Sequence, residues 1–153
     1  MNDSSKLSRM ALESGAIRLS PEKPFTWASG YKMPIYNDNR LLLGKAEYRS
    51  FIAQIFAKYS EASVDNLDVI AGTATAGIPH ATTLADRLSK PLIYVRATTK
   101  SHGMGNQIEG PLVPGQKVLL IEDLISTGGS AINAVNAIRE VGGIVEHCFC
   151  IFS

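Results

Sequence analysis

Apolar residues follow two alternating patterns along most of this chain. Three segments have apolar positions at helical spacing: residues 51–59, "GIPHATTLADRLSK" and "GSAINAVNAIREVGG". Four brief apolar runs separate or follow them: "LDVIAG", "PLIYV", "QKVLLI" and "IVEHCFCIF". Short buried strands that alternate with helices indicate parallel pairing through right-handed crossovers. We therefore predict an α/β fold with a doubly wound, mainly parallel sheet flanked by helices.

Some finer predictions follow from the same pattern. A helix that begins near Gly44 should bury one face, which we assign to Phe51, Ile52, Ile55, Phe56 and Tyr59. The two cysteines, Cys148 and Cys150, fall within the last apolar run. We interpret them as packed free thiols on opposite faces of that strand, and we expect neither a disulfide nor a metal site from them.

The first 40 residues have a different pattern. A short helix is expected from Leu7 to Ser14, ended by Gly15. From Ile17 to Tyr36, prolines and glycines divide the chain into short extended pieces, which predict a small flap or hood. A length of 153 residues with 45% hydrophobic content suits one core. We expect a single domain over 1–153, with a helix and hood over about 1–40 and the core over about 41–153.

The charge balance argues against two classes of partner. Lys and Arg number 15 against 14 Asp and Glu, so no strong positive field predicts binding to nucleic acid or to an anionic membrane. No segment approaches the run of about 20 apolar residues that a membrane span needs, and the N-terminus does not resemble a signal peptide. We expect a soluble, cytoplasmic protein.

The exits of the predicted strands are the candidate ligand-binding positions, because ligands of such sheets bind beyond the carboxyl ends of the strands. These exits are "AGTATAGIP", "RATTKSHGMGNQIEG" and "EDLISTGGS". In the last, residues 126–130 form a hydroxyl-rich and glycine-rich turn at the start of a helix, where backbone N–H groups attract phosphate. A simple helix N-cap at Thr127 or Ser130 explains this turn equally well.

Two adjacent carboxylates precede the turn. Glu122 and Asp123 would repel a bare phosphate, so they are expected to face hydroxyl groups or a bound cation. A sugar phosphate satisfies both halves of the motif. The alternative is that one acid caps a neighbouring helix while the other is solvated. The chain has no G-x-x-x-x-G-K-[ST] loop and no G-x-G-x-x-G after a strand, which excludes two common phosphate-binding motifs.

The motif resembles the phosphoribosyl pyrophosphate loop of the type I phosphoribosyltransferases. Together with "FTWASGYKMPIYNDNR", "GTATAGIPHA" and "YVRATTKSHGMGNQIEG", it is most similar to the orotate branch of that family. The resemblance covers nearly the whole chain. It implies transfer of a phosphoribosyl group from phosphoribosyl pyrophosphate to orotate in pyrimidine (UMP) biosynthesis. Family members continue beyond "CFCIFS" through a further strand and helix, so we expect a truncated chain.

The resemblance also implies roles for individual residues. The implied catalytic residues are Lys100, Arg96, His102 and Asp123, with the two cations and the histidine on a lid over the pyrophosphate. Phosphoribosyl pyrophosphate would be bound by these residues and by Glu122, Leu124, Ile125, Ser126, Thr127, Gly128, Gly129 and Ser130, and orotate by Ser126, Tyr36 and Asn37. A solvated basic loop is the alternative for the lid.

Cofactor and partners follow from the same resemblance. Mg²⁺ would be carried mainly by the substrate, with no metal site made by the protein alone. A homodimer is implied, with each active site shared between chains. Ala28, Ala76 and Ala97 stand where other family branches carry lysine. A purine phosphoribosyltransferase, or a non-catalytic regulator that binds phosphoribosyl pyrophosphate, remains the alternative.

Overall fold

The computed structural model describes residues 2–27, 30–98 and 107–153. The chain forms two compact units, Met1–Arg49 and Ser50–Ser153, which are described separately. Because the boundary lies within α2 (Ala46–Ser63), that helix begins in the first unit and continues in the second. The predicted division into one hood and one core near residue 40 stays a prediction.

The N-terminal unit consists of a helix and short strands. Helix α1 (Asp3–Glu13) begins where the Asn2 side chain accepts a hydrogen bond from the Ser5 amide at 2.8 Å, and Gly15 follows it with φ +74°. Strand β1 (Ile17–Leu19) pairs antiparallel with β4 (Ile35–Asn37), and β2 (Phe25–Thr26) with β3 (Lys32–Met33). A 3₁₀ helix, η1 (Asn39–Gly44), completes the unit. The predicted short helix and extended pieces are confirmed.

The second unit contains a five-stranded sheet in the order β7-β6-β5-β8-β9. Its elements along the chain are β5 (Val69–Thr73), α3 (Gly77–Leu88), β6 (Leu92–Val95), β7 (Ile108–Glu109), β8 (Lys117–Leu124), α4 (Gly129–Glu140) and β9 (Ile144–Phe152). All pairings are parallel except that of β7 with β6. The predicted α/β fold is confirmed. The two-residue edge strand β7 was not predicted, because it is too short to show a pattern of its own.

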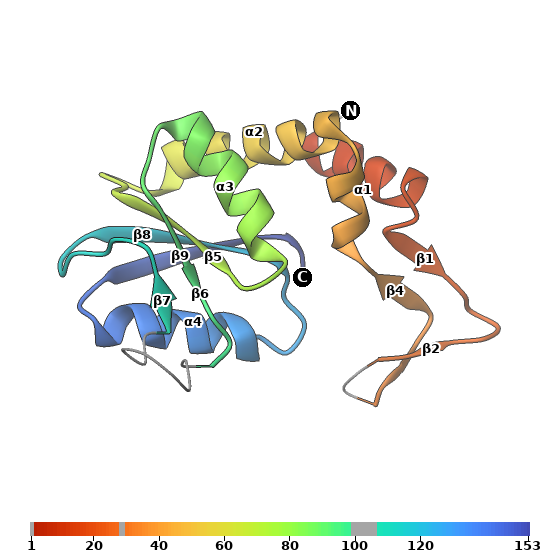
Figure 1. Cartoon of the computed structure of the whole chain (residues 1–153). Helices are drawn as coiled ribbons and strands as arrows, with labels where there is room; N and C mark the ends of the chain where they lie inside the picture. Colours follow the sequence, from red (N-terminus) through yellow and green to blue (C-terminus); the bar gives the residue numbers. More distant parts are fainter. Residues whose placement is uncertain (1, 28–29, 99–106) are drawn as a thin grey trace. The chain divides into compact units, whose positions relative to one another are not determined.

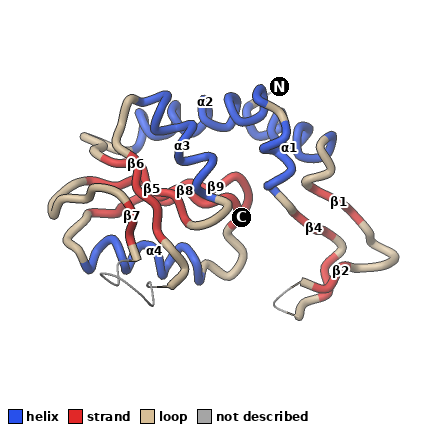
Figure 2. The backbone as a smooth tube through the Cα atoms, viewed as in Figure 1, coloured by secondary structure: helices blue, strands red, loops and turns tan. Residues whose placement is uncertain are grey.

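Helices cover both faces of this sheet. Figure 2 shows α2 and α3 on one side and α4 on the other. On the α4 side, Val69, Ile93 and Leu120 of the strands pack with Ala134 and Ile138 of the helix. On the other side, the rings of Phe56 and Phe149 lie 5.9 Å apart. Burial of both faces explains why the strands are nearly continuous apolar runs rather than alternating ones. The carboxyl ends of β5, β6 and β8 point the same way (Figure 1).

Two of the finer predictions are wrong. Tyr59 is 47% exposed, and Ser60 is buried in its place, since the buried face of α2 shifts by one residue in the last turns. Cys148 and Cys150 lie opposite Leu120 and Glu122 of β8, so they share one face of the sheet, as residues two apart in a strand do. Both are free thiols, and burial raises the pKa of Cys148 to about 12.

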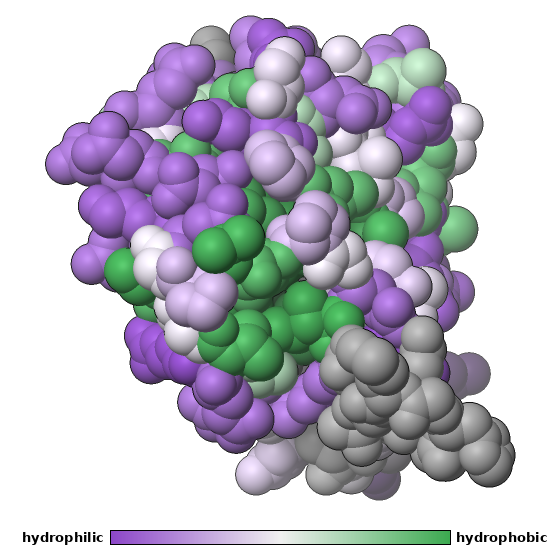
Figure 3. All heavy atoms as spheres, turned by 60° about the vertical axis from the view of Figure 1, so that its left-hand side comes forward, coloured by the Kyte–Doolittle hydropathy of each residue, from purple (hydrophilic) through white to green (hydrophobic). Residues whose placement is uncertain are grey.

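Some large apolar side chains remain at the surface. Figure 3 shows a hydrophobic area on one face, bordered by hydrophilic residues. The exposed set in the second unit includes Val113, Ile132, Val141 and Ile144. Exposed apolar side chains of this kind are normal for folded domains. Over the described ranges, no helix is long and apolar enough to cross a membrane.

Candidate active site

The exit of β8 carries the acidic pair and the glycine-rich turn. Strand β8 is buried from Val118 to Glu122, and α4 begins seven positions later at Gly129. The N-cap of α4 is Gly128, whose φ of +82° is in the left-handed region that favours glycine. The alternative N-cap at Thr127 or Ser130 is therefore wrong. The first turn of α4 opens directly beyond the strand that carries the carboxylates.

Glu122 is buried and held at both carboxylate oxygens. It is 5% exposed; its Oε1 accepts a hydrogen bond from the Asp123 amide at 3.1 Å, and its Oε2 accepts one from the Ser130 hydroxyl at 2.9 Å. Glu122 is therefore neither solvated nor the cap of the backbone N–H groups of a helix. The structure thus joins Glu122 to the first turn of α4 through a side chain.

Asp123 is half-buried beside Glu122. Burial, followed by the hydrogen bond and the negative charge of Glu122, raises the pKa of Asp123 from 3.8 to about 6. Two carboxyl groups this close resist simultaneous ionisation, because each disfavours the charge of the other. A ligand that brings hydroxyl donors or positive charge to the pair would stabilise the ionised form.

The exit of β5 is joined to the neighbouring strands. The Thr73 hydroxyl donates to the Ile121 carbonyl of β8 at 3.2 Å, and the Ala74 amide donates to the Val95 carbonyl of β6 at 2.8 Å. The next peptide bond, Ala74–Thr75, is cis. A Cβ at Gly77 would lie 2.5 Å from the Ile121 carbonyl oxygen, so glycine allows α3 to start against β8.

The exit of β6 is anchored on two sides. Arg96 and Gln107 exchange hydrogen bonds of 2.9 Å, one through the Arg96 amide and one through the Gln107 side-chain amide. The Arg96 guanidinium lies 3.7 Å from a Glu109 carboxylate oxygen of β7. The Asn133 side-chain amide of α4 donates to the Ala97 carbonyl at 3.1 Å. Two predicted site residues, Lys100 and His102, lie outside the described residues.

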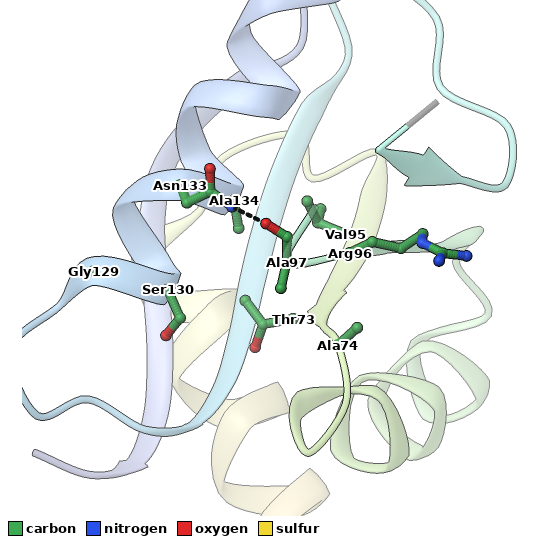
Figure 4. Close-up of a pocket in the computed structure, with 9 residues that line it drawn as sticks. All are labelled: Thr73, Ala74, Val95, Arg96, Ala97, Gly129, Ser130, Asn133 and Ala134. Carbon is green, nitrogen blue, oxygen red and sulfur yellow. Dashed lines mark hydrogen bonds between the residues drawn. The ribbon is translucent and has the colours of Figure 1, made fainter. Parts of the chain in front are cut away.

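These three exits enclose a cavity of about 190 Å³. Figure 4 shows it between the start of α4 and the ends of β5 and β6, with the Arg96 side chain directed away from Ser130 and Thr73. Its lining residues are Thr73, Ala74, Val95, Arg96, Ala97, Gly129, Ser130, Asn133 and Ala134.

Only part of this lining follows from the sequence motifs. Arg96, Gly129 and Ser130 were predicted as site residues, and Thr73 and Ala74 fall in a strand exit that the pattern singled out without assigning roles. Asn133 has no signal of its own in the sequence. Its position one turn into α4, a helix expected to begin at a phosphate loop, is the feature that could have indicated it.

The other residues of the predicted loop divide into two groups. Leu124 pairs with Phe152, and the Ile125 amide donates to the Phe152 carbonyl at 3.0 Å, so both anchor the loop to β9. Ser126 and Thr127 are exposed and present their hydroxyls at the surface. The polar part of the loop therefore projects from an apolar base.

Tyr36 and Asn37, the residues predicted to contact orotate, belong to the N-terminal unit. The Tyr36 ring lies 5.4 Å from that of Phe25, and the Arg18 guanidinium lies 4.9 Å from the Tyr36 ring centre. Both side-chain amide atoms of Asn37 are buried without a hydrogen-bond partner among the described residues. A buried amide of this kind usually pairs with a further group, which a ligand can supply.

The described part of the chain brings together no group of three or more His, Cys, Asp or Glu side chains that could hold a metal ion. The acidic pair, Glu122 and Asp123, offers carboxylate oxygens at the site. Mg²⁺ keeps several waters and binds through one or two carboxylates with substrate phosphates. The residues present therefore fit a magnesium ion whose remaining ligands come from substrate and water.

A mainly parallel sheet with an acidic pair and a glycine-rich turn at one strand exit is typical of the phosphoribosyltransferases. Residues 41–152 match the family described as phosphoribosyl transferase domain. The orotate phosphoribosyltransferase of Listeria innocua is 52% identical over 153 residues, which cover 100% of this chain and 73% of the relative. The chain therefore belongs to the orotate phosphoribosyltransferase family.

Solved structures of the family have the same fold. The orotate phosphoribosyltransferase of Aeropyrum pernix superposes with a TM-score of 0.82 at 32% identity, covering 94% of this chain and 79% of that one. The Mycobacterium tuberculosis H37Rv enzyme, in complex with 5-phospho-α-D-ribosyl 1-diphosphate, superposes with a TM-score of 0.70 at 27% identity, covering 97% of this chain and 82% of that one.

Proposed function

We propose that this protein transfers the phosphoribosyl group of phosphoribosyl pyrophosphate to orotate, giving orotidine 5′-monophosphate and pyrophosphate in pyrimidine biosynthesis. The observation that carries the proposal is the acidic pair, buried Glu122 and half-buried Asp123, a few residues before the glycine turn at the start of α4. The 52% identity to the Listeria innocua orotate phosphoribosyltransferase supports orotate as the acceptor.

In this reaction, a ring nitrogen of orotate loses its proton to solvent and forms a bond to the anomeric carbon of the ribose. The bond from that carbon to the pyrophosphate oxygen breaks, and its electron pair leaves with pyrophosphate. The ribose gains oxocarbenium character in the transition state, so negative groups beside it are stabilising. Glu122 and Asp123 supply these groups through the ribose hydroxyls. Donation from those hydroxyls would favour the ionised form of Asp123, whose pKa is raised to about 6 by burial and by the neighbouring Glu122.

We assign the 5′-phosphate to the turn over residues 126–130. Unpaired backbone N–H groups at the start of α4 point to this position, and the helix dipole favours an anion there. The left-handed Gly128 shapes the turn, and the exposed Ser126 and Thr127 hydroxyls add donors. Leu124 and Ile125 hold the turn in place through β9.

The leaving pyrophosphate requires cations. We assign this role to Arg96, Lys100 and His102, by the resemblance of "YVRATTKSHGMGNQIEG" to the family. Mg²⁺ carried mainly by substrate oxygens and water would supply charge neutralisation at the pyrophosphate. In the described structure Arg96 pairs with Glu109, so the guanidinium has to change partner to reach pyrophosphate.

Orotate is assigned to Ser126, Tyr36 and Asn37. The exposed Ser126 hydroxyl can accept or donate a hydrogen bond. The buried Asn37 side chain has a donor nitrogen and an acceptor oxygen, and neither has a hydrogen-bond partner among the described residues. A pyrimidine carboxylate offers matching donors and acceptors.

A direct assay tests the proposed reaction. The purified protein is mixed with phosphoribosyl pyrophosphate, Mg²⁺ and orotate, and the loss of orotate absorbance is followed. We expect turnover with orotate and none when adenine or hypoxanthine replaces it. Turnover with a purine would instead identify a purine phosphoribosyltransferase. Binding of phosphoribosyl pyrophosphate without any turnover would identify a regulator.

We further propose a homodimer in which Arg96, Lys100 and His102 of one chain act at the Glu122–Ser130 segment of the other. A polar loop that leaves a strand end can reach across a two-fold interface. Lys100→Ala and Asp123→Asn are then each nearly inactive alone. After subunit exchange, half of the dimers are hybrids with one intact site each, so activity rises to about a quarter of the wild-type value. A mixture that stays inactive after exchange, shown by tagged subunits, contradicts the shared site.

A further inference from the structure

One arginine of the N-terminal unit lies against two aromatic rings. Arg18 of β1 is opposite Tyr36 of β4 in the antiparallel ladder, so the two side chains project from the same face. The Arg18 guanidinium carbon lies 4.9 Å from the Tyr36 ring centre and 5.6 Å from the Phe25 ring centre. Because the two ring centres are 5.4 Å apart, one guanidinium contacts an aromatic pair that joins β4 to β2.

This contact restrains the guanidinium without using its hydrogen-bond donors. A guanidinium stacks on aromatic rings through its flat face, whereas its N–H groups point outward in its plane. Arg18 is exposed, so these donors are accessible to a ligand from solution. Among the residues that the structure describes, none forms a hydrogen bond or an ion pair with the Arg18 guanidinium. The group is therefore held in place with its donors and its charge available to an anion.

The acidic residue two positions after Tyr36, Asp38, already has a different partner. Its two carboxylate oxygens accept hydrogen bonds from the Arg40 side chain at 2.6 Å and 2.9 Å. The hydrogen bond with Arg40, and to a smaller extent the charge of Arg18, lower the pKa of Asp38. Asp38 is thus ionised at neutral pH and paired with Arg40, so the anion that binds Arg18 has to come from a ligand.

The chemistry of this position favours a planar acid. A carboxylate can accept two parallel hydrogen bonds from one guanidinium, and these charge-assisted bonds are stronger than those to a neutral carbonyl group. The rings of Phe25 and Tyr36 provide an aromatic surface beside the donors. Orotate carries both matching features, because its carboxylate is attached directly to a planar pyrimidine ring.

We propose that Arg18 is a specificity-determining residue whose guanidinium binds the carboxylate of the pyrimidine acceptor. Since the rings of Phe25 and Tyr36 already restrain the guanidinium, little conformational freedom is lost when the carboxylate binds. The inference rests on the proposed function, because it takes orotate as the acceptor. It extends that function by naming the group that separates orotate from a pyrimidine without a carboxylate, such as uracil.

Two nucleotides that differ only in the carboxylate test this role. Orotidine 5′-monophosphate and uridine 5′-monophosphate share the pyrimidine ring, the ribose and the phosphate, and only the first carries the carboxylate. Arg18→Met removes the donors and the charge but keeps an unbranched side chain against the rings. In calorimetry, we expect Arg18→Met to weaken orotidine 5′-monophosphate binding by about tenfold and to change uridine 5′-monophosphate binding by less than about twofold.

Two results of this titration would overturn the proposal. Unchanged binding of orotidine 5′-monophosphate would show that the carboxylate does not contact Arg18. An equal loss for both nucleotides would show that Arg18 only supports the packing of Phe25 and Tyr36. Steady-state kinetics give a second readout, in which Arg18→Met should raise KM for orotate by about tenfold and change KM for phosphoribosyl pyrophosphate by less than about twofold.

Two further variants separate the guanidinium from its charge. Arg18→Lys keeps the charge but lacks the planar pair of donors, so orotidine 5′-monophosphate binding should weaken by about threefold. Lys23→Met removes a positive charge from another exposed position of the same unit, and it should change the binding of either nucleotide by less than about twofold. If Lys23→Met weakened orotidine 5′-monophosphate binding as much as Arg18→Met does, the general charge of the unit would explain the loss and the proposal would be wrong.

The proposed function and this inference fail in different ways. If the wild-type protein turns over orotate, but Arg18→Met binds orotidine 5′-monophosphate as tightly as wild type, the function stands and the role of Arg18 is wrong. If the wild-type protein binds neither nucleotide and does not turn over orotate, both are wrong. Circular dichroism of each variant verifies that a lost affinity does not come from unfolding.

Discussion

The β8–α4 segment and the exits of β5 and β6 build the two halves of the candidate site in different ways. In the first, the key contact joins Glu122 to Ser130, eight positions apart along the chain. In the second, the contacts join Thr73 to Ile121, 48 positions apart, and Asn133 to Ala97, 36 positions apart. The first half is a continuous motif, and the second exists only when the sheet and its helices have assembled.

This difference predicts different consequences of substitution. A change in the continuous segment should impair the chemistry while the fold survives, because the segment comprises the polar end of β8 and the turn after it rather than the apolar core. A change at a long-range contact should act first on stability or on the geometry of the cavity. Four substitutions test this contrast, from the largest expected effect to the smallest.

The largest effect is expected for Asp123→Asn. The change is nearly isosteric but removes a negative charge beside the ribose, where positive charge develops in the transition state. We expect kcat to fall by about a hundredfold or more, which corresponds to about 3 kcal/mol of transition-state stabilisation. Steady-state kinetics with orotate measure it, with far-ultraviolet circular dichroism as the control for folding. Activity within threefold of wild type would remove Asp123 from the reaction.

Gly77→Ala should act on stability instead. A Cβ at this position would lie 2.5 Å from the Ile121 carbonyl oxygen and 2.6 Å from the Thr73 hydroxyl oxygen, and the carbonyl belongs to the backbone of a central strand. We expect the free energy of unfolding to fall by about 2 to 3 kcal/mol, measured by urea denaturation without ligand.

Gly129→Ala is the matched control for Gly77→Ala. It also places a methyl group at the start of a helix, but no atom lies within 4 Å of the added Cβ. Its unfolding free energy should remain within about 1 kcal/mol of wild type, with any change toward greater stability. Equal losses for the two variants would show that the close approach of α3 to β8 is not what requires glycine at Gly77.

Asp123→Asn should also change stability, by a smaller amount. Activity should fall, whereas stability should rise. The pKa of Asp123 is raised in the folded protein from 3.8 to about 6, so the folded state binds this proton more tightly than the unfolded state does. The carboxylate therefore costs stability above about pH 6, and that cost disappears as the pH falls toward 4. Allowing for its partial exposure, we expect Asp123→Asn to stabilise the protein by about 1 kcal/mol near pH 7.5.

Denaturant titrations of wild type and Asp123→Asn at two pH values verify this sign. The stability difference should be present near pH 7.5 and close to zero near pH 4. A variant that is less stable than wild type at the higher pH would show that the Asp123 charge is well accommodated without ligand. In that case the pair would not depend on ribose hydroxyls for its ionisation.

The smallest effect is expected for Asn133→Ala. Its side-chain hydrogen bond to the Ala97 carbonyl is exposed, and alanine is the better helix former, so stability should change by less than about 0.5 kcal/mol. Loss of the bond loosens the exit of β6 beside the cavity. We expect KM for phosphoribosyl pyrophosphate to rise by about twofold with kcat unchanged. A tenfold change would mean that Asn133 contacts the substrate itself.

Much of the fold could be predicted because its signals are local. Apolar runs, helical spacing and turn residues located α1, α2, α3 and α4 and every strand of the parallel sheet. The edge strand β7 was missed, since two residues carry no periodicity. The exposure of Tyr59 was missed because helical spacing alone does not show at which residue a helix stops packing against the rest of the protein.

The sequence by itself determined the chemistry of the β8–α4 segment. Glu122, Asp123 and the glycine turn are adjacent along the chain, so backbone geometry places them together wherever the strand and helix form. Only the tertiary structure decided that Ser130 donates a hydrogen bond to Glu122 and that the pKa of Asp123 is raised. Both features depend on burial beside the sheet. It also brought Thr73, Ala97 and Asn133 to one cavity. Parallel strands align their carboxyl ends through long-range pairing, and no local pattern in the sequence records which distant side chains will meet there.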